Sequence, residues 1–271
     1  MTINRVSPEL SLAGRSARAH DPDRFLIALF APAACREALF LLIAFNHELV
    51  RALEMQSGRS GAGPIAALIR LQWWREVVEG QARRHELAEP LGAMLSEGGL
   101  DREALLRIVE AREAEAEGIE TLEQWRQLQL DGPGGIQVAF GMALGERDEA
   151  VLARLRAAGA AYGVGGLLRH HASILQAGRC PFPEDLLQQY GTGREALLAA
   201  EGASLDPAMF APLREAGVAW LASAKGPRLG RSRVAAALPG VLARRDLARP
   251  PEAAPRGLGD RLALIPAWLV G

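Results

Sequence analysis

Acidic side chains that could hold a metal ion are scarce on the apolar helices that this sequence predicts. Two aspartates four residues apart on a helix point to one side and can bridge Mg²⁺ to a diphosphate. No apolar helix of the 271-residue chain is predicted to carry such a pair. Glu54 is the one acid at a suggestive place, near the end of an apolar helix predicted over 35–56. The acidic run of Glu113, Glu115 and Glu117 is typical of a solvated helix face.

The histidines and cysteines form no recognisable ligand set either. His170 and His171 are adjacent, so on a helix their side chains point about 100° apart and cannot bind one metal from the same face. Cys35 and Cys180 have neither the spacing of a metal site nor that of a disulfide framework. His47 lies on the predicted apolar helix and is expected to be a hydrogen-bonded core residue. Zinc chemistry therefore has no support in the sequence.

Composition places the chain among all-α globular proteins. Apolar residues make up 49% of it, and aromatic and β-branched residues are scarce, which favours helices over strands. The formal net charge of −1 does not indicate a nucleic-acid partner, and no apolar run approaches the roughly 20 residues that cross a bilayer. We predict a flexible N-terminal tail over 1–20 and one all-α domain over 21–245. Residues 246–271 are predicted to be a proline-rich linker and a short apolar tail that packs on the bundle.

Turn residues and apolar spacing predict the helices of this domain. Asp21-Pro22 is typical of a helix start, and Asp131-Gly132-Pro133 is expected to break or sharply bend a helix. A helix predicted over 148–177 contains four glycines, which indicates close approach of backbones rather than a phosphate-binding loop. These glycines are Gly159, Gly163, Gly165 and Gly166. The other predicted helices cover 24–30, 35–56, 65–86, 101–117, 207–224 and 234–245, and the last is expected to be kinked at Pro239 and Gly240.

Three segments give the chain a resemblance to the squalene and phytoene synthase family. They are Ala44-Phe45, the run Ile69-Arg70-Leu71-Gln72-Trp73-Trp74-Arg75-Glu76, and the stretch from Leu167-Leu168-Arg169 through Gly178-Arg179 to Pro183-Glu184-Asp185-Leu186-Leu187. The resemblance implies the all-α isoprenoid synthase fold, a single-domain helical bundle around a central apolar cavity. Members of the family join two prenyl diphosphates head to head, with Mg²⁺ held between two aspartate-rich helices.

The chain departs from that family where its metal ligands stand. The positions that match the first aspartate-rich motif are Val50, Arg51 and Glu54, and those that match the second are His170, Ser173 and Ile174. Glu54 alone cannot hold a cluster of Mg²⁺ ions, which prefer octahedral shells of hard oxygen ligands. Arg51 is expected to repel a metal from the first motif. The resemblance therefore implies no bound metal, no cofactor and no ionisation of a diphosphate.

The segment Ala44-Phe45-Asn46-His47-Glu48-Leu49 resembles a non-catalytic branch of the family. That branch contains the mitochondrial respiratory complex I assembly factor with a phytoene-synthase-like domain and its bacterial relatives. The resemblance implies a scaffold that binds a protein partner in a respiratory complex or an isoprenoid lipid. It also implies a cytoplasmic location with peripheral contact to the inner membrane, or the mitochondrial matrix in a eukaryote.

Two alternatives stay open. One is an active head-to-head prenyl diphosphate synthase with an altered site, which would require Mg²⁺. The other is a protein that binds a prenyl diphosphate without turnover. In both alternatives a largely cationic clamp is expected to hold the diphosphate. The predicted clamp consists of Glu48, Glu54, Arg70, Arg75, Arg169 and Arg179.

Overall fold

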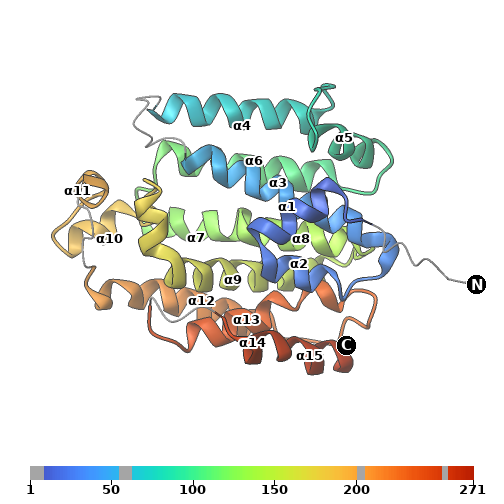
Figure 1. Cartoon of the computed structure of the whole chain (residues 1–271). Helices are drawn as coiled ribbons and strands as arrows, with labels where there is room; N and C mark the ends of the chain where they lie inside the picture. Colours follow the sequence, from blue (N-terminus) through green and yellow to red (C-terminus); the bar gives the residue numbers. More distant parts are fainter. Residues whose placement is uncertain (1–8, 55–62, 200–204, 252–255) are drawn as a thin grey trace, which may run out of the picture.

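The computed structural model describes residues 9–54, 63–199, 205–251 and 256–271, and every regular element in these ranges is helical (Figure 1). The longer α-helices are α1 (Leu12–His20), α3 (Arg36–Glu54), α4 (Gly63–Glu79), α5 (Ala88–Ser96), α6 (Arg102–Glu117), α7 (Leu122–Asp131), α8 (Pro133–Ala143), α9 (Glu149–Gln176), α12 (Ala211–Ser223) and α13 (Pro239–Leu247). The shorter ones are α2 (Pro22–Ala28), α10 (Glu184–Gln189), α11 (Arg194–Ala199), α14 (Leu258–Leu262) and α15 (Leu264–Val270), with 3₁₀ turns η1 (Ala33–Cys35), η2 (Pro207–Phe210) and η3 (Val234–Ala236).

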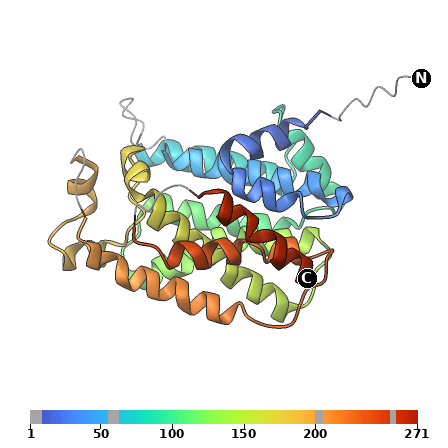
Figure 2. The same ribbon diagram turned by 60° about the horizontal axis from the view of Figure 1, so that its bottom comes forward.

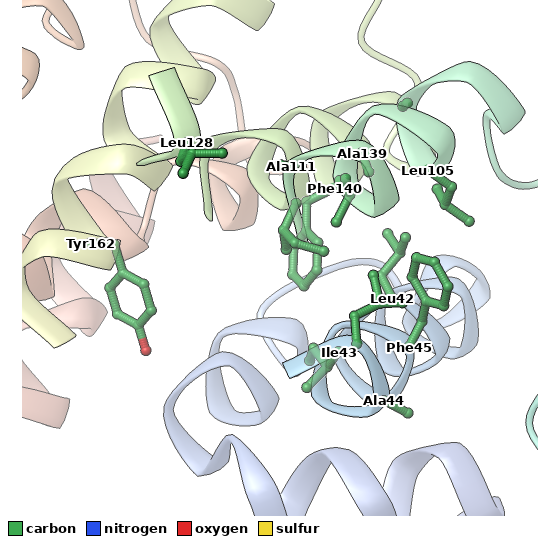
Figure 3. Packing of buried hydrophobic residues seen from close by; sticks show 14 of the residues in the cluster. Leu42, Ile43, Ala44, Phe45, Leu105, Ala111, Leu128, Ala139, Phe140 and Tyr162 are labelled. Carbon is green, nitrogen blue, oxygen red and sulfur yellow. The ribbon is translucent and has the colours of Figure 1, made fainter. Parts of the chain in front are cut away.

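The core helix of the bundle is α3, which packs against α1, α2, α4, α6 and α8. Its first half is buried on all sides over 38–45, because every residue of that stretch is apolar. Leu42 and Phe45 point toward Leu105 of α6 and Phe140 of α8 (Figure 3). The apolar run therefore places α3 in the interior, as its composition predicts.

Glycines allow α9 to pack closely between α8, α12 and α13. A Cβ atom at Gly159 would lie 2.6 Å from the carbonyl oxygen of Pro133, and one at Gly163 would lie 2.6 Å from the Pro133 ring. A Cβ atom at Gly165 would lie 2.9 Å from a side chain of α13. The predicted close approach is confirmed at these glycines. Gly166 differs, because nothing lies within 4 Å of a Cβ atom built there.

Several predicted helix starts are confirmed by capping groups. The Asp21 carboxylate accepts a 2.9 Å hydrogen bond from the backbone N–H of Arg24 at the start of α2. At the start of α6 the Asp101 carboxylate accepts a 2.8 Å bond from the N–H of Ala104. The predicted break between α7 and α8 is also present, and Pro133 occupies the first turn of α8, where its missing N–H costs little.

Two predicted helices have different bounds in the structure. The helix predicted over 65–86 ends at Glu79, because Gly80 follows with a φ of 109° and leaves the helical conformation. The helix predicted over 234–245 is instead the turn η3 followed by α13. Pro239 explains the change, since proline starts a helix more readily than it continues one.

The N-terminal region contains a helix where the sequence predicted a flexible tail. Residues 12–20 form α1, and the part of the predicted tail at 1–8 lies outside the described residues. Ser11 caps the helix by accepting a 2.9 Å hydrogen bond from a backbone N–H of the first turn. Ala13 and Ala17 are buried and small, so α1 lies close against α3. The many polar residues of this segment led to the prediction of a flexible tail, although one face of the helix packs on the bundle.

The C-terminal region also contains helices, α14 and α15, where a linker and tail were predicted. Leu264 is fully buried, and the Trp268 ring lies 5.7 Å from that of Phe30, in agreement with the predicted packing on the bundle. No helix in the described ranges is long and apolar enough to span a bilayer.

A pair of stacked histidines joins α1 to α3. The ring centroids of His20 and His47 lie 3.7 Å apart, and the ring planes differ by 7°. Burial lowers the pKa of His47 below its ordinary value, and the positive charge of His20 lowers it further. His47 is therefore half-buried in a ring stack rather than enclosed in the core.

This stack predicts a loss of stability in mild acid. We expect the free energy of unfolding to fall as the pH drops below about 6.5, because the unfolded chain then protonates His47 more readily than the folded protein does. The pKa of His47 is lower in the folded protein than in the unfolded chain. The contribution of neutral His47 to stability is therefore complete above the unfolded pKa and is lost as the pH falls through the folded pKa. Urea unfolding between about pH 7.5 and about pH 5.5 measures it. His47→Gln is expected to lose stability less steeply than the wild type, and an equal slope would contradict the assignment.

Candidate functional site

A cavity of about 310 Å³ lies at the junction of α2, α3, α6, α7, α8 and α9. Three residues of α3 reach it, Asn46, Val50 and Glu54, because a spacing of four places them on one side of that helix. Gly166 and His170 of α9 reach it from the other side by the same spacing. The two helices α3 and α9, which carry the segments that resemble the aspartate-rich motifs, therefore face each other across this cavity.

Only some of the residues at the positions that match the first aspartate-rich motif point into the cavity. Val50 and Glu54 line it, whereas Arg51 points outward with 57% of its side chain exposed. The Arg51 guanidinium lies 3.7 Å from the Glu48 carboxylate on the same helix. Arg51 therefore lies outside the cavity lining, because neighbouring positions on a helix face different directions.

The positions that match the second aspartate-rich motif are likewise only partly directed into the cavity. His170 and Ile174 line the cavity, whereas Ser173 is exposed and its hydroxyl donates a 2.9 Å hydrogen bond to the His170 carbonyl. Burial lowers the pKa of His170, and the nearby Arg169 lowers it further. No acid of α9 within the described residues replaces the missing carboxylates at this wall.

The predicted diphosphate clamp is not assembled at the cavity. Of its six members, Glu54 and Arg179 line the cavity. Arg70 is exposed on α4, and Arg75 pairs with Glu113 at 2.5 Å on the outside of the bundle. Arg169 faces α13, where its side chain is buried 3.8 Å from a carboxylate. These arginines occupy helix faces that sequence spacing did not distinguish.

A buried charge cluster that the sequence did not predict forms one wall of the cavity. Arg112 of α6 donates a 2.7 Å hydrogen bond to Glu115, and Arg179 from the loop after α9 donates bonds of 2.8 and 2.6 Å to the same carboxylate. Arg112 also donates a 3.2 Å bond to the side chain of Asn46. We call Arg112, Glu115 and Arg179 the buried triad. The prediction of a solvated face is wrong for Glu115, which is 8% exposed.

The triad keeps its central carboxylate ionised. Burial opposes ionisation of Glu115, but the guanidinium groups of Arg179 and Arg112 more than offset it and hold the pKa of this carboxyl below its usual range. Burial likewise lowers the pKa of Arg112, and Glu115 opposes that effect. The triad therefore holds two cations around one anion and gives this wall of the cavity a net positive charge.

Arg24 adds another cation that the sequence did not predict for this site. It is 6% exposed, pairs with Asp21 at 3.2 Å and lies 4.6 Å above the centroid of the Tyr162 ring. Burial raises the pKa of Tyr162 to about 12, so its hydroxyl stays neutral. Within the part of the chain that the structure describes, two buried nitrogen atoms of Arg24 and one of Arg112 have no hydrogen-bond partner.

The donor set does not fit Mg²⁺. Over the described ranges, no group of three or more His, Cys, Asp or Glu side chains is placed to hold a metal ion. The oxygens of Glu115, which face this cavity, already accept hydrogen bonds from Arg112 and Arg179. A magnesium ion there would displace those hydrogen bonds and would be repelled by the net positive charge of the buried triad.

Comparisons with known proteins identify the family and the fold of the chain. The family model described as squalene/phytoene synthase matches residues 17–267. A crystal structure of a dehydrosqualene synthase in complex with ligand is similar with a TM-score of 0.71 and 12% identity, over 95% of this chain and 94% of that chain. The squalene synthase HpnC from Alicyclobacillus acidocaldarius is similar with a TM-score of 0.64 and 19% identity, over 87% of this chain and 90% of that chain. No curated protein sequence matches the chain. The structural likeness confirms the predicted isoprenoid synthase fold.

Proposed function

Because the chain belongs to the squalene/phytoene synthase family, we propose that it binds an isoprenoid lipid with a phosphate-bearing head in this cavity, without Mg²⁺ and without converting it. One observation carries the proposal. Arg24, Arg112 and Arg179 line the cavity together, beside the helix positions that resemble the family's two aspartate-rich motifs. The scaffold of a prenyltransferase is kept, and its metal-dependent chemistry has lost its ligands.

The arginines supply the groups that a phosphate needs. A guanidinium presents a planar fork of N–H donors that matches phosphate oxygens and stays charged at any relevant pH. Arg24, Arg112 and Arg179 all line the cavity, so their guanidinium groups can supply N–H donors to such oxygens.

The rest of the lining suits one apolar chain. Val50, Ile119, Leu128, Leu167 and Ile174 contribute apolar surface to the walls. A volume of about 310 Å³ is at the lower end of the range of small-molecule sites. This size favours a single prenyl chain over the two chains that head-to-head condensation joins.

Binding can be tested by thermal unfolding with farnesyl diphosphate, once in EDTA and once in Mg²⁺. We expect stabilisation in both, by about 2.7 kcal/mol when the ligand is at a hundredfold its Kd, and no product by chromatography. Gly166→Leu is the matched control, because Gly166 lines the cavity with open space at its Cβ position. The leucine should fill the cavity and abolish the shift without crowding the helix. Stabilisation only in Mg²⁺, or none at all, would contradict metal-free binding.

The alternative of an active prenyltransferase is favoured by one feature of the site. Glu54 and Arg179 from the predicted clamp do line the cavity. A Mg²⁺-dependent product from farnesyl or geranylgeranyl diphosphate would support this alternative, and Glu54→Ala should then abolish turnover. A protein partner in respiratory complex assembly stays a prediction that rests on the sequence resemblance.

A further inference from the structure

A second, smaller cavity of about 120 Å³ lies between α9, α12 and α13. Helices α12 and α13 lie next to each other on the face of the bundle that Figure 2 turns forward, and both pack on α9. The smaller cavity takes its α9 residues from 151–158, whereas the larger cavity described above takes them from 162–174. Among the described residues the two cavities share no lining residue, so they are separate sites along one helix.

Most of the lining of the smaller cavity is apolar. Leu155, Ala158 and Leu229 line it and are buried. Half-buried apolar side chains from α9, α12 and α13 add to the walls; they are Val151, Leu221 and Val241. An apolar protein cavity of about 150 Å³ holds one benzene molecule. The smaller cavity therefore has room for an apolar body of about five or six carbon atoms.

Every charged side chain that lines the smaller cavity is a cation. These side chains are Arg154 of α9, Lys225 of the loop after α12, and Arg244 of α13, and we call the site the cationic cavity. Over the described ranges none of the three forms an ion pair with a carboxylate. Their neighbours on the same helices do, since Arg156 pairs with Asp131 and Arg245 with Asp260. The cationic cavity therefore keeps a positive charge that no lining carboxylate offsets.

Two backbone carbonyls orient the Arg154 guanidinium without neutralising its charge. The guanidinium donates a 3.3 Å hydrogen bond to the carbonyl of Ala224 and a 2.9 Å bond to that of Pro227. Its second terminal nitrogen, Nη1, donates to no group in the part of the chain that the structure describes. A group that is held in place before binding loses less conformational freedom when a ligand arrives. Arg154 therefore provides a fixed donor at the wall of the cationic cavity.

We propose that the cationic cavity binds a small molecule with an oxyanion head, phosphate or carboxylate, on an apolar body of about six carbon atoms. Small-molecule sites combine a mostly apolar lining with a few polar groups that fix the ligand, and this cavity has both. Guanidinium and ammonium groups bind phosphate and carboxylate oxygens through charge-assisted hydrogen bonds. A neutral molecule would leave the three cations without a counter-ion, and a bare anion would leave the apolar walls in water. The proposal does not rest on the ligand of the larger cavity.

Lys225 is the only lysine of the chain and therefore gives the cationic cavity its own reporter. Reductive methylation with isotope-labelled formaldehyde keeps the charge of the lysine and labels it for NMR, together with the α-amino group as an internal reference. We expect hexyl phosphate and hexanoate to shift the Lys225 signal in a saturable manner, and the tighter of the two identifies the preferred head.

Three further compounds test the two parts of the ligand separately. Hexanol keeps only the apolar body, and inorganic phosphate and acetate keep only the head. Each should bind at least about tenfold more weakly than the corresponding complete ligand, because it loses either the charge-assisted hydrogen bonds or the apolar contact. Binding of hexanol or of inorganic phosphate as tight as that of hexyl phosphate would overturn the proposal, as would the absence of any shift.

A matched pair of arginine variants separates the cavity from general surface charge. Arg244→Gln removes a lining cation and should weaken the binding of hexyl phosphate about tenfold. Arg228→Gln removes an exposed arginine that lies three residues after Lys225 and outside the lining, and it should bind like the wild type. Equal losses in both variants, or none in Arg244→Gln, would overturn the assignment.

Two glycine variants locate the binding within the protein. A Cβ atom at Gly240 would lie 3.6 Å from Ala158, an ordinary contact, so Gly240→Leu should fill the cationic cavity and abolish the shift of the Lys225 signal. Gly166→Leu fills the larger cavity and should leave that shift unchanged, which keeps a failure here distinct from a failure of the proposed function. Circular dichroism verifies that each variant folds. Binding lost only in Gly166→Leu would place the ligand in the larger cavity and overturn the proposal.

Discussion

Replacing Glu115 with alanine is expected to lower the free energy of unfolding by about 3–5 kcal/mol, since it removes the only carboxylate of the buried triad and leaves two cations. The Arg112 side chain is 8% exposed and that of Arg179 is 15% exposed, so water cannot replace the lost carboxylate fully. Urea unfolding of the purified variant at neutral pH measures the change. The folded pKa of Glu115 lies below the unfolded one, so its stabilisation is present above the unfolded pKa and lost as the pH falls through the folded pKa.

Glu117→Ala is the matched control for this experiment. Glu117 lies two positions further along the same helix and is exposed. Its replacement should change the free energy of unfolding by less than about 0.5 kcal/mol. Similar losses in both variants would show that the triad contributes no more than a surface charge, and the description of the cavity wall would then be wrong.

Replacing Gly159 with alanine is expected to lower the free energy of unfolding by about 1–3 kcal/mol through overpacking. The new methyl group would lie 2.6 Å from the Pro133 carbonyl oxygen and 2.9 Å from the Gly134 backbone. Both neighbours are backbone atoms of α8 and cannot rotate away, so the two helices must separate. Denaturant unfolding monitored by circular dichroism measures the loss.

Gly166→Ala, on the same helix, is expected to raise the free energy of unfolding instead of lowering it. Nothing lies within 4 Å of its Cβ position, so alanine meets no neighbour. Alanine is better than glycine inside a helix by about 0.5–1 kcal/mol, and the variant is expected to gain that amount. If both variants lose stability equally, close approach is not the reason for glycine at position 159.

The fold and much of the local structure could be predicted from the residues alone. Apolar composition and the scarcity of strand formers led to an all-α bundle. Asp21 and Asp101 marked helix starts, and Pro133 marked the break between α7 and α8, as the structure confirms. These features depend on local physics, because caps and proline act within one turn. The family resemblance could also be found in the sequence, because it depends on residue identities along the chain. The family match over residues 17–267 confirms it.

Which charged residues meet at the cavity depends on how the helices pack in three dimensions. Glu115 and Arg179 are 64 positions apart, and Arg24 comes from α2, so no local spacing reveals that they share one cavity. Sequence reasoning expected Glu115 in solvent and Arg51 at the site, and the structure places each in the opposite position. Helix periodicity predicts which residues share a face, but the packing of neighbouring helices decides which face is buried. The cluster of Arg24, Arg112 and Arg179 at the cavity is a product of that packing.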